Sequence, residues 1–246
     1  MCRICTEPLE SLLELTKLDC SNCPVLEAIP PTLVKLTTLY CHHCPRLASI
    51  PSTLVKLTKL GCARCPLLTS IPSTLVTLAE LHCSHCPRLA SIPPTLVNLT
   101  TLWCHSCPLL PSIPATLVNL TTLWCCNCPL LPSIPATLAN LTTLWCSHCP
   151  LLPSIPATLA NLTTLDCSSC PWLPQNAADF PTHIPSLLRI QRWFRTGRKQ
   201  VFKRMLRTKA FNEFVFHPDR IGGRLVKRQM EAELGAMRPA KQQRVE

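Results

Sequence analysis

The chain has 246 residues, of which 47% are hydrophobic, and it carries a formal net charge of +11 at pH 7. This hydrophobic content excludes a chain that is disordered throughout. Five glycines, 26 prolines and 5% aromatic residues are unlike an ordinary globular fold, which needs glycine in its turns and large rings in its core. A short repeated unit would account for the composition.

The charge divides the chain into two parts. Residues 1–185 hold eight Lys/Arg and eight Asp/Glu, whereas residues 186–246 hold sixteen Lys/Arg and five Asp/Glu. The first residues lack the apolar stretch of a secretory signal, and no run reaches about 18 apolar residues, the length that spans a membrane. With 19 cysteines, an odd number, the sequence predicts free thiols in a reducing compartment and a cytoplasmic protein.

Residues 1–14 are interpreted as a partial N-terminal repeat or cap, and residues 15–173 as eight 21-residue repeats. A C-x-x-C-P pattern recurs every 21 residues, from Cys20/Cys23 to Cys167/Cys170. We number each unit from its first Leu, so that it reads L-x-x-L-x-C-x-x-C-P-x-L-x-x-I-P-x-T-L-x-x. Positions 4 and 6 alternate as on one face of a short strand, and the prolines at positions 10 and 16 exclude a long helix. Stacked units would bury their apolar edges together and pair their strands in parallel.

This pattern resembles the leucine-rich repeats, whose L-x-x-L-x-L-x-x-N/C-x-L signature matches roughly residues 9–173. It is most similar to the cysteine-containing repeats of plant resistance receptors, with Cys in place of Leu at position 6 and a shorter return. The resemblance implies a right-handed solenoid with a concave parallel β-sheet and short or irregular convex segments. It also implies that the concave face contacts proteins or peptides.

The C-x-x-C pairs have two interpretations. Their spacing fits four-thiolate zinc sites, which would make the chain a zinc-stabilised nucleic-acid-binding protein. However, the cysteines are in phase with the leucines, as buried core residues would be, and equivalent residues of a solenoid lie in ladders and do not converge on one ion. We therefore favour core thiols and assign no metal ligand and no cofactor. Cys2 and Cys5 alone are too short a fragment to indicate a zinc domain.

The position-5 residues should project from the sheet on its concave face. They include three consecutive tryptophans flanked by histidines of positions 7 and 8, and Trp is enriched at binding hot spots. The predicted partner-binding residues are Tyr40, His82, Trp103, Trp124, Trp145, His43, His85 and His148. The alternative is that near-identical repeats simply copied one tryptophan. No catalytic constellation is present, because a nucleophilic cysteine needs an accessible, electropositive site. We expect a non-catalytic protein-protein interaction scaffold.

Residues 174–185 are interpreted as a linker, and residues 186–246 as a basic helical tail. The tail contacts are predicted to be Arg189, Arg192, Arg195, Arg198, Lys199, Lys203, Arg204 and Arg207. Such a helix could bind a calmodulin-like protein, nucleic acid or an anionic membrane, or it could cap the last repeat. Its F-N-E-x-x-x-H-P-D-x-I-G-G segment also resembles leucine-rich repeat proteins of large DNA viruses, which implies a role in the host cytoplasm.

Overall fold

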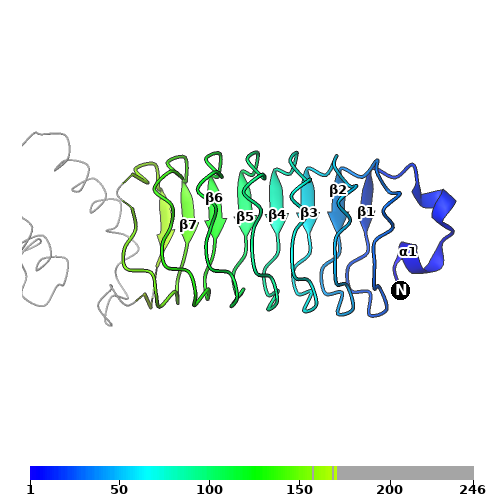
Figure 1. Cartoon of the computed structure of the whole chain (residues 1–246), viewed down its shortest axis with the longest axis horizontal. Coiled ribbons are helices and arrows are strands. Elements are labelled where there is room, and N and C mark those ends of the chain that lie inside the picture. The colour runs from blue at the N-terminus through cyan, green and yellow to red at the C-terminus, as the bar shows by residue number, and fades with distance from the viewer. Residues whose placement is uncertain (157, 168, 171–246) are drawn as a thin grey trace, which may run out of the picture. The chain divides into compact units, whose positions relative to one another are not determined.

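Eight short parallel strands form one sheet in sequence order (Figure 1). The computed structural model describes residues 1–156, 158–167 and 169–170. The strands are β1 (Lys17–Asp19), β2 (Thr38–Tyr40), β3 (Lys59–Gly61), β4 (Glu80–His82), β5 (Thr101–Trp103), β6 (Thr122–Trp124), β7 (Thr143–Trp145) and β8 (Thr164–Asp166). Each strand pairs with the next in the register of the repeat, for example Trp103 with Trp124. The predicted solenoid with a parallel sheet is confirmed.

The core is a continuous column of leucine, cysteine and isoleucine from every coil. In the coil of β5, the strand residue Leu102 and the two cysteines that follow it, Cys104 and Cys107, are fully buried. Leu110, Ile113 and Leu117 of the return segment complete the ring. These are the positions that the sequence pattern assigned to the interior. The cysteines of positions 6 and 9 are therefore core residues.

The backbone ladder extends beyond the three-residue strands. Cys104 donates its N–H to the carbonyl of Trp124 at 2.8 Å, and Ser106 donates to Cys126 at 2.8 Å. Because the carbonyl of position 7 accepts from position 8 of the preceding coil, the turn after each strand is held almost as firmly as the strand itself.

Side chains hold the return segments together where proline removes backbone donors. Thr116 Oγ1 donates to the carbonyl of Pro94 at 2.6 Å, and Asn119 Nδ2 donates to the carbonyl of Val97 at 2.9 Å. Equivalent threonine and asparagine bonds recur 22 residues apart along the stack. Each coil is thus linked to its neighbour on both sides of the core.

Two short helices precede the sheet: α1 (Arg3–Thr6) and the 3-10 helix η1 (Leu9–Leu12). Leu12 and Cys2 are buried, and Ile4 packs partly buried against the same core. Residues 1–14 therefore cover the open edge of the first coil, and they contribute no strand to the sheet.

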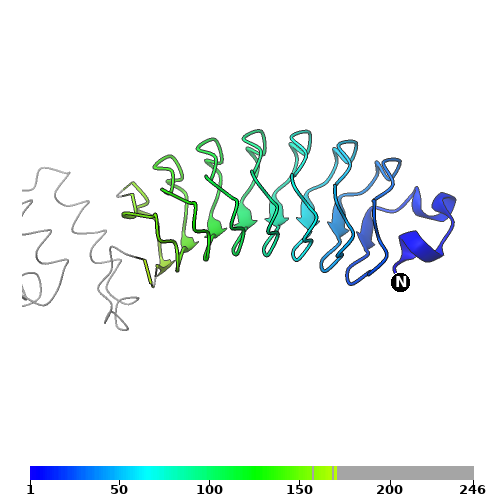
Figure 2. The same cartoon turned by 60° about the horizontal axis from the view of Figure 1, so that its bottom comes forward.

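The described coils follow a curve with the strands on its inner side, as Figure 2 shows. Within the described residues, no helix is both long and apolar enough to span a bilayer. The predicted linker, the basic helical tail and its eight arginine and lysine contacts fall in residues 171–246, which lie outside the described residues.

Candidate functional site

The last residue of each strand projects from the concave face, and four of these side chains form a continuous ring stack. His82 lies on Trp103 with ring centroids 4.0 Å apart and planes 4° from parallel. Trp103 and Trp124 are 4.7 Å apart at 12°, and Trp124 and Trp145 are 4.5 Å apart at 11°. The stack exists because the strands pair in register, which places position 5 of each coil beside position 5 of the next.

The tryptophan side chains are less exposed to solvent than their position at the end of each strand predicted. All three are only partly exposed, because each ring covers its neighbour. Their indole Nε1 atoms are buried without a hydrogen-bond partner. An unsatisfied buried donor costs about 1–3 kcal/mol, whereas an aromatic pair contributes about 0.5–1.5 kcal/mol beyond its buried area. The unpaired donors therefore offset part of the stabilisation that the stacked rings contribute.

Beside the stack, two rings cover the one glycine of the position-5 row. A Cβ added to Gly61 would lie 2.3 Å from His42 Nε2 and 2.7 Å from Tyr40 Cδ1. Tyr40 and His42 stack at 5.8 Å, and His42 Nδ1 accepts the backbone N–H of Ala63 at 3.2 Å. Because Gly61 has no side chain, the rings of Tyr40 and His42 can occupy the space beside it, and the aromatic surface continues across β3.

The predicted histidines of position 8 form a second row on the turn after the strands. His43, His85 and His148 are exposed, with φ of 54°, 55° and 57°. His85 meets His105 edge-on at 4.9 Å, and His105 Nδ1 lies 2.8 Å from Ser84 Oγ. His105 also lies 6.4 Å from Trp124, so it links this row to the ring stack.

Burial favours the neutral form of four imidazoles, those of His42, His82, His85 and His105. It lowers the pKa of His82, a change reinforced by His42 and Lys59 and opposed by Glu80. It also lowers the pKa of His42, His85 and His105 below the ordinary value of 6.5. The rings of the stack are therefore uncharged at neutral pH.

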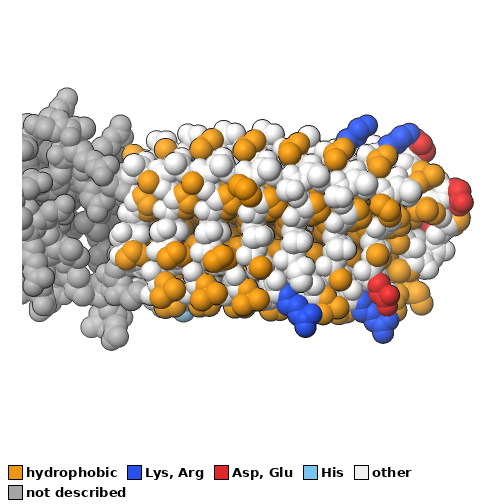
Figure 3. All heavy atoms as spheres, in the orientation of Figure 1, with side chains coloured by type: hydrophobic (Ala, Val, Ile, Leu, Met, Phe, Trp, Pro, Cys, Tyr) orange, Lys and Arg blue, Asp and Glu red, His pale blue; other side chains and the backbone are white. Residues whose placement is uncertain are grey.

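The coils that carry the tryptophans contain no charged residue between Arg88 and Asp166. Figure 3 views the return side of the stack, and there rows of hydrophobic side chains run along the coils while Lys, Arg, Asp and Glu gather toward the α1 end. Four ion pairs of the described residues likewise lie in this part of the chain, the last of them between Lys59 and Glu80. A partner of the tryptophan coils would meet a neutral surface.

The repeat cysteines do not form the zinc sites considered above. Each position-9 thiol from Cys44 onward donates to the carbonyl of a position-6 cysteine in the preceding coil, as Cys107 does to Cys83 at 3.2 Å. Burial raises the pKa of Cys104 well above its usual value. The alternative of a zinc protein built on the repeat pairs is not supported.

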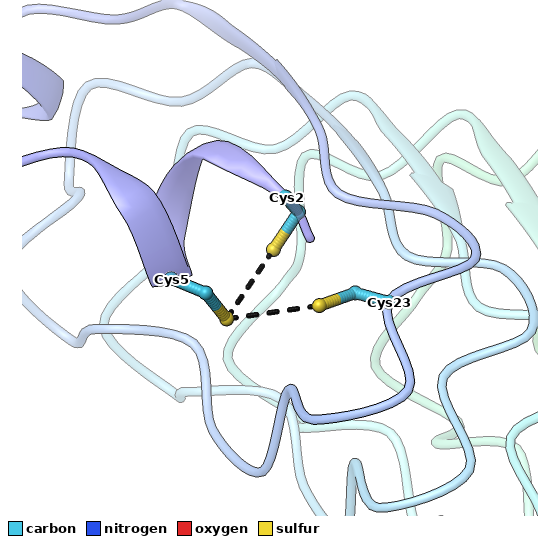
Figure 4. A group of neighbouring side chains, drawn as sticks. All are labelled: Cys2, Cys5 and Cys23. Carbon is cyan, nitrogen blue, oxygen red and sulfur yellow. Dashed lines mark hydrogen bonds between the residues drawn. The ribbon is translucent and has the colours of Figure 1, made fainter.

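One other group of thiols does converge. Cys2 Sγ lies 3.7 Å from Cys5 Sγ, which lies 3.6 Å from Cys23 Sγ, and Figure 4 shows the three side chains pointing toward one another. In the described part of the chain, this is the one group of three or more potential metal ligands whose atoms all lie within 4.8 Å. Burial would raise the pKa of Cys23, but hydrogen bonding with Cys2, Val25 and Cys5 lowers it to about 7. Burial and the contacts with Cys23 and Cys2 instead raise the pKa of Cys5 to about 12.

The structure thus joins His82 and the three tryptophans, and it places Tyr40 beside His42. It sets His43, His85 and His148 on the turn beside this stack. The sequence interpretation left out the role of Gly61 and the cluster of Cys2, Cys5 and Cys23. A signal for the cluster was present, because Cys2 lies one 21-residue period before Cys23, whereas Cys5 is out of phase with the repeat cysteines.

Comparison with known proteins supports the repeat assignment. The Leucine Rich Repeat family model matches residues 14–36, 119–141 and 140–162. A search of curated protein sequences finds no match. Among solved structures, the leucine-rich repeat domain of the type III effector XopL aligns with 67% of this chain and 73% of its own, at a TM-score of 0.53 and 22% identity.

Two further structures have the same fold. A plant ice-binding protein aligns at a TM-score of 0.51 and 23% identity, covering 65% of this chain and 58% of its own. The TDR receptor aligns at a TM-score of 0.50 and 22% identity, covering 66% of this chain and 36% of its own. At this level of identity, the likeness concerns the solenoid fold and not its ligands.

Proposed function

We propose that this leucine-rich repeat protein is a non-catalytic scaffold that binds an uncharged, apolar peptide or protein segment on the concave face of β4–β7. The observation that carries the proposal is the stack of His82, Trp103, Trp124 and Trp145. Leucine-rich repeat solenoids commonly mediate protein-protein interactions on this curved surface.

The stack suits recognition because it is large, rigid and partly exposed. Each ring is fixed by its neighbours at 4.0–4.7 Å, so that little side-chain entropy is lost when a partner binds. The unpaired indole N–H groups add to this argument. Buried polar groups without a partner reduce stability, and such groups are expected where a surface serves function.

The absence of charge between Arg88 and Asp166 specifies the partner further. A nucleic acid needs Lys or Arg against its phosphates, and the three coils that carry the tryptophans offer neither. A segment rich in apolar and aromatic side chains would bury its surface on the rings at no cost of desolvating a charge.

Peptide selection on the full-length chain, followed by isothermal titration calorimetry with the selected peptides, tests the proposal. We expect the selected peptides to be apolar and poor in charge. Replacing Trp103, Trp124 and Trp145 by Ala should weaken their binding by about thirtyfold or more, because a hot-spot residue contributes about 2 kcal/mol. The difference between wild type and variant should change little with salt.

The matched control replaces Leu109, Leu130 and Leu151 by Ala. These exposed leucines belong to the same three coils but lie after the turn and outside the strands, so the control should retain peptide binding. Equal loss in both triple variants, or unchanged binding in the tryptophan variant, would contradict the proposal.

The proposal includes a cytoplasmic, reducing location. The described cysteines are all free, and the core packs their thiols against carbonyl groups. An oxidising compartment would expose any transiently opened coil to non-native disulfides.

A further inference from the structure

The first coil of the stack has an unusual sulfur at position 9. In the seven later coils, the position-9 thiol donates to a carbonyl of the coil before it, at 3.1–3.3 Å. Cys23 has no full coil before it. Its Sγ instead faces the Sγ of Cys5. The Sγ of Cys5 also faces the Sγ of Cys2, three residues earlier in the chain.

The distances within this group fit coordination. Four sulfurs around a zinc ion at about 2.3 Å are separated by about 3.8 Å along each edge of the tetrahedron. The two sulfur-sulfur distances here are 3.7 Å and 3.6 Å, and all three ligand atoms lie within 4.8 Å of one another. The atoms are too far apart for a disulfide, whose bond length is about 2.05 Å.

The surroundings of the group differ from those of the core cysteines. Cys2 and Cys23 are buried against the end of the core, whereas Cys5 is exposed. An ion can therefore enter from solvent, while the two buried sulfurs are fixed by packing.

We propose that Cys2, Cys5 and Cys23 form a three-thiolate site for a thiophilic divalent cation, Zn²⁺ foremost, which fastens α1 to the first coil. Solvent completes the coordination on the exposed side of Cys5. Binding transfers the three thiol protons to solvent as the thiolates ligate the ion. The site joins segments 18 residues apart, so the bound ion closes the N-terminal edge of the solenoid.

The test uses the full-length chain, purified under reducing conditions without added metal and titrated with Co²⁺ and then Zn²⁺. We expect one equivalent of Co²⁺ per chain with the absorption bands of a tetrahedral thiolate complex, and its displacement by Zn²⁺. Cys5→Ser should weaken Co²⁺ binding by at least about a hundredfold, more than the loss of a second-shell partner causes.

Cys126→Ser is the matched control, since Cys126 is a partly exposed cysteine outside both the cluster and the core. It should bind Co²⁺ as wild type does. Circular dichroism should show an unchanged sheet in Cys5→Ser, because Cys5 is exposed and is not a core residue.

A second measurement needs no variant. Alkylation mapped by mass spectrometry should find the exposed Cys5 protected by Zn²⁺ and reactive after chelation. The proposal is overturned if Zn²⁺ does not change the alkylation of Cys5, if Cys5→Ser binds Co²⁺ as tightly as wild type, or if the bands are those of an octahedral complex.

Discussion

At the residue scale, the most constrained backbone position is position 8, which lies in the turn that follows each strand. Position 8 has φ between 54° and 58° in all eight coils, yet it is occupied by Asn, His, Arg or Ser and never by Gly. The left-handed region costs most side chains about 1–2 kcal/mol, and Asn tolerates it best. The backbone bond to the next coil, such as Ser106 N to Cys126 O at 2.8 Å, holds the residue there.

Ser106→Gly should therefore raise the free energy of unfolding by up to about 1 kcal/mol, since it removes this strain and keeps the backbone bond. Ser91→Gly, in an exposed part of the return where φ is not positive, should instead lower it by about 0.5–1 kcal/mol. Urea unfolding of both variants measures the two effects. A loss of stability in Ser106→Gly would contradict the account.

At the scale of the coil, stability comes from ladders between equivalent positions. Each three-residue strand buries only one side chain on the core face. Hydrogen bonds of side chains in the return segment must therefore supply the remaining stabilisation between coils. The asparagines of position 21 do this by donating to the preceding coil, from Asn98 to Asn161.

Asn119→Ala should lower the free energy of unfolding by about 1 kcal/mol, because it leaves the carbonyl of Val97 without this donor. Val118→Ala, at the neighbouring exposed position of the same return, should change it by less than about 0.5 kcal/mol. Thermal unfolding monitored by circular dichroism distinguishes them, and equal effects would show that the asparagine ladder contributes nothing specific.

At the scale of the whole molecule, the solenoid has a charged beginning and a neutral, aromatic end. Histidines occur in both parts, and burial lowers the pKa of His42, His82, His85 and His105. The unfolded chain therefore binds more protons than the folded chain just below pH 6.5, the ordinary value.

The free energy of unfolding should consequently fall as pH is lowered through 6.5, and it should level off below the folded pKa values. Measurement should stop near pH 5, above the range in which carboxylates titrate. His82→Phe keeps a ring against Trp103 and removes one titrating group, so its stability should depend less on pH. A flat wild-type profile between pH 7 and about pH 5 would contradict the prediction.

The 21-residue period predicted the strand register, the buried leucines and cysteines, and the surface that carries Trp103, Trp124 and Trp145. It could do so because each coil contacts only its neighbours, so that a sequence repeat translates directly into a spatial ladder. The identities of the candidate site residues followed from the same pattern. Their exposure did not, because it depends on how far each ring covers the next.

Tertiary structure alone decided the features that break the repeat. The near-parallel stacking of the indoles, the leaning of Tyr40 and His42 over Gly61, and the meeting of Cys5 with Cys23 all depend on side-chain directions or on the end of the stack. A periodic pattern describes the interior of a ladder, where every coil has the same two neighbours. At the first coil one neighbour is missing, and there the folded chain brings Cys5 against Cys23, 18 residues away and outside the 21-residue period.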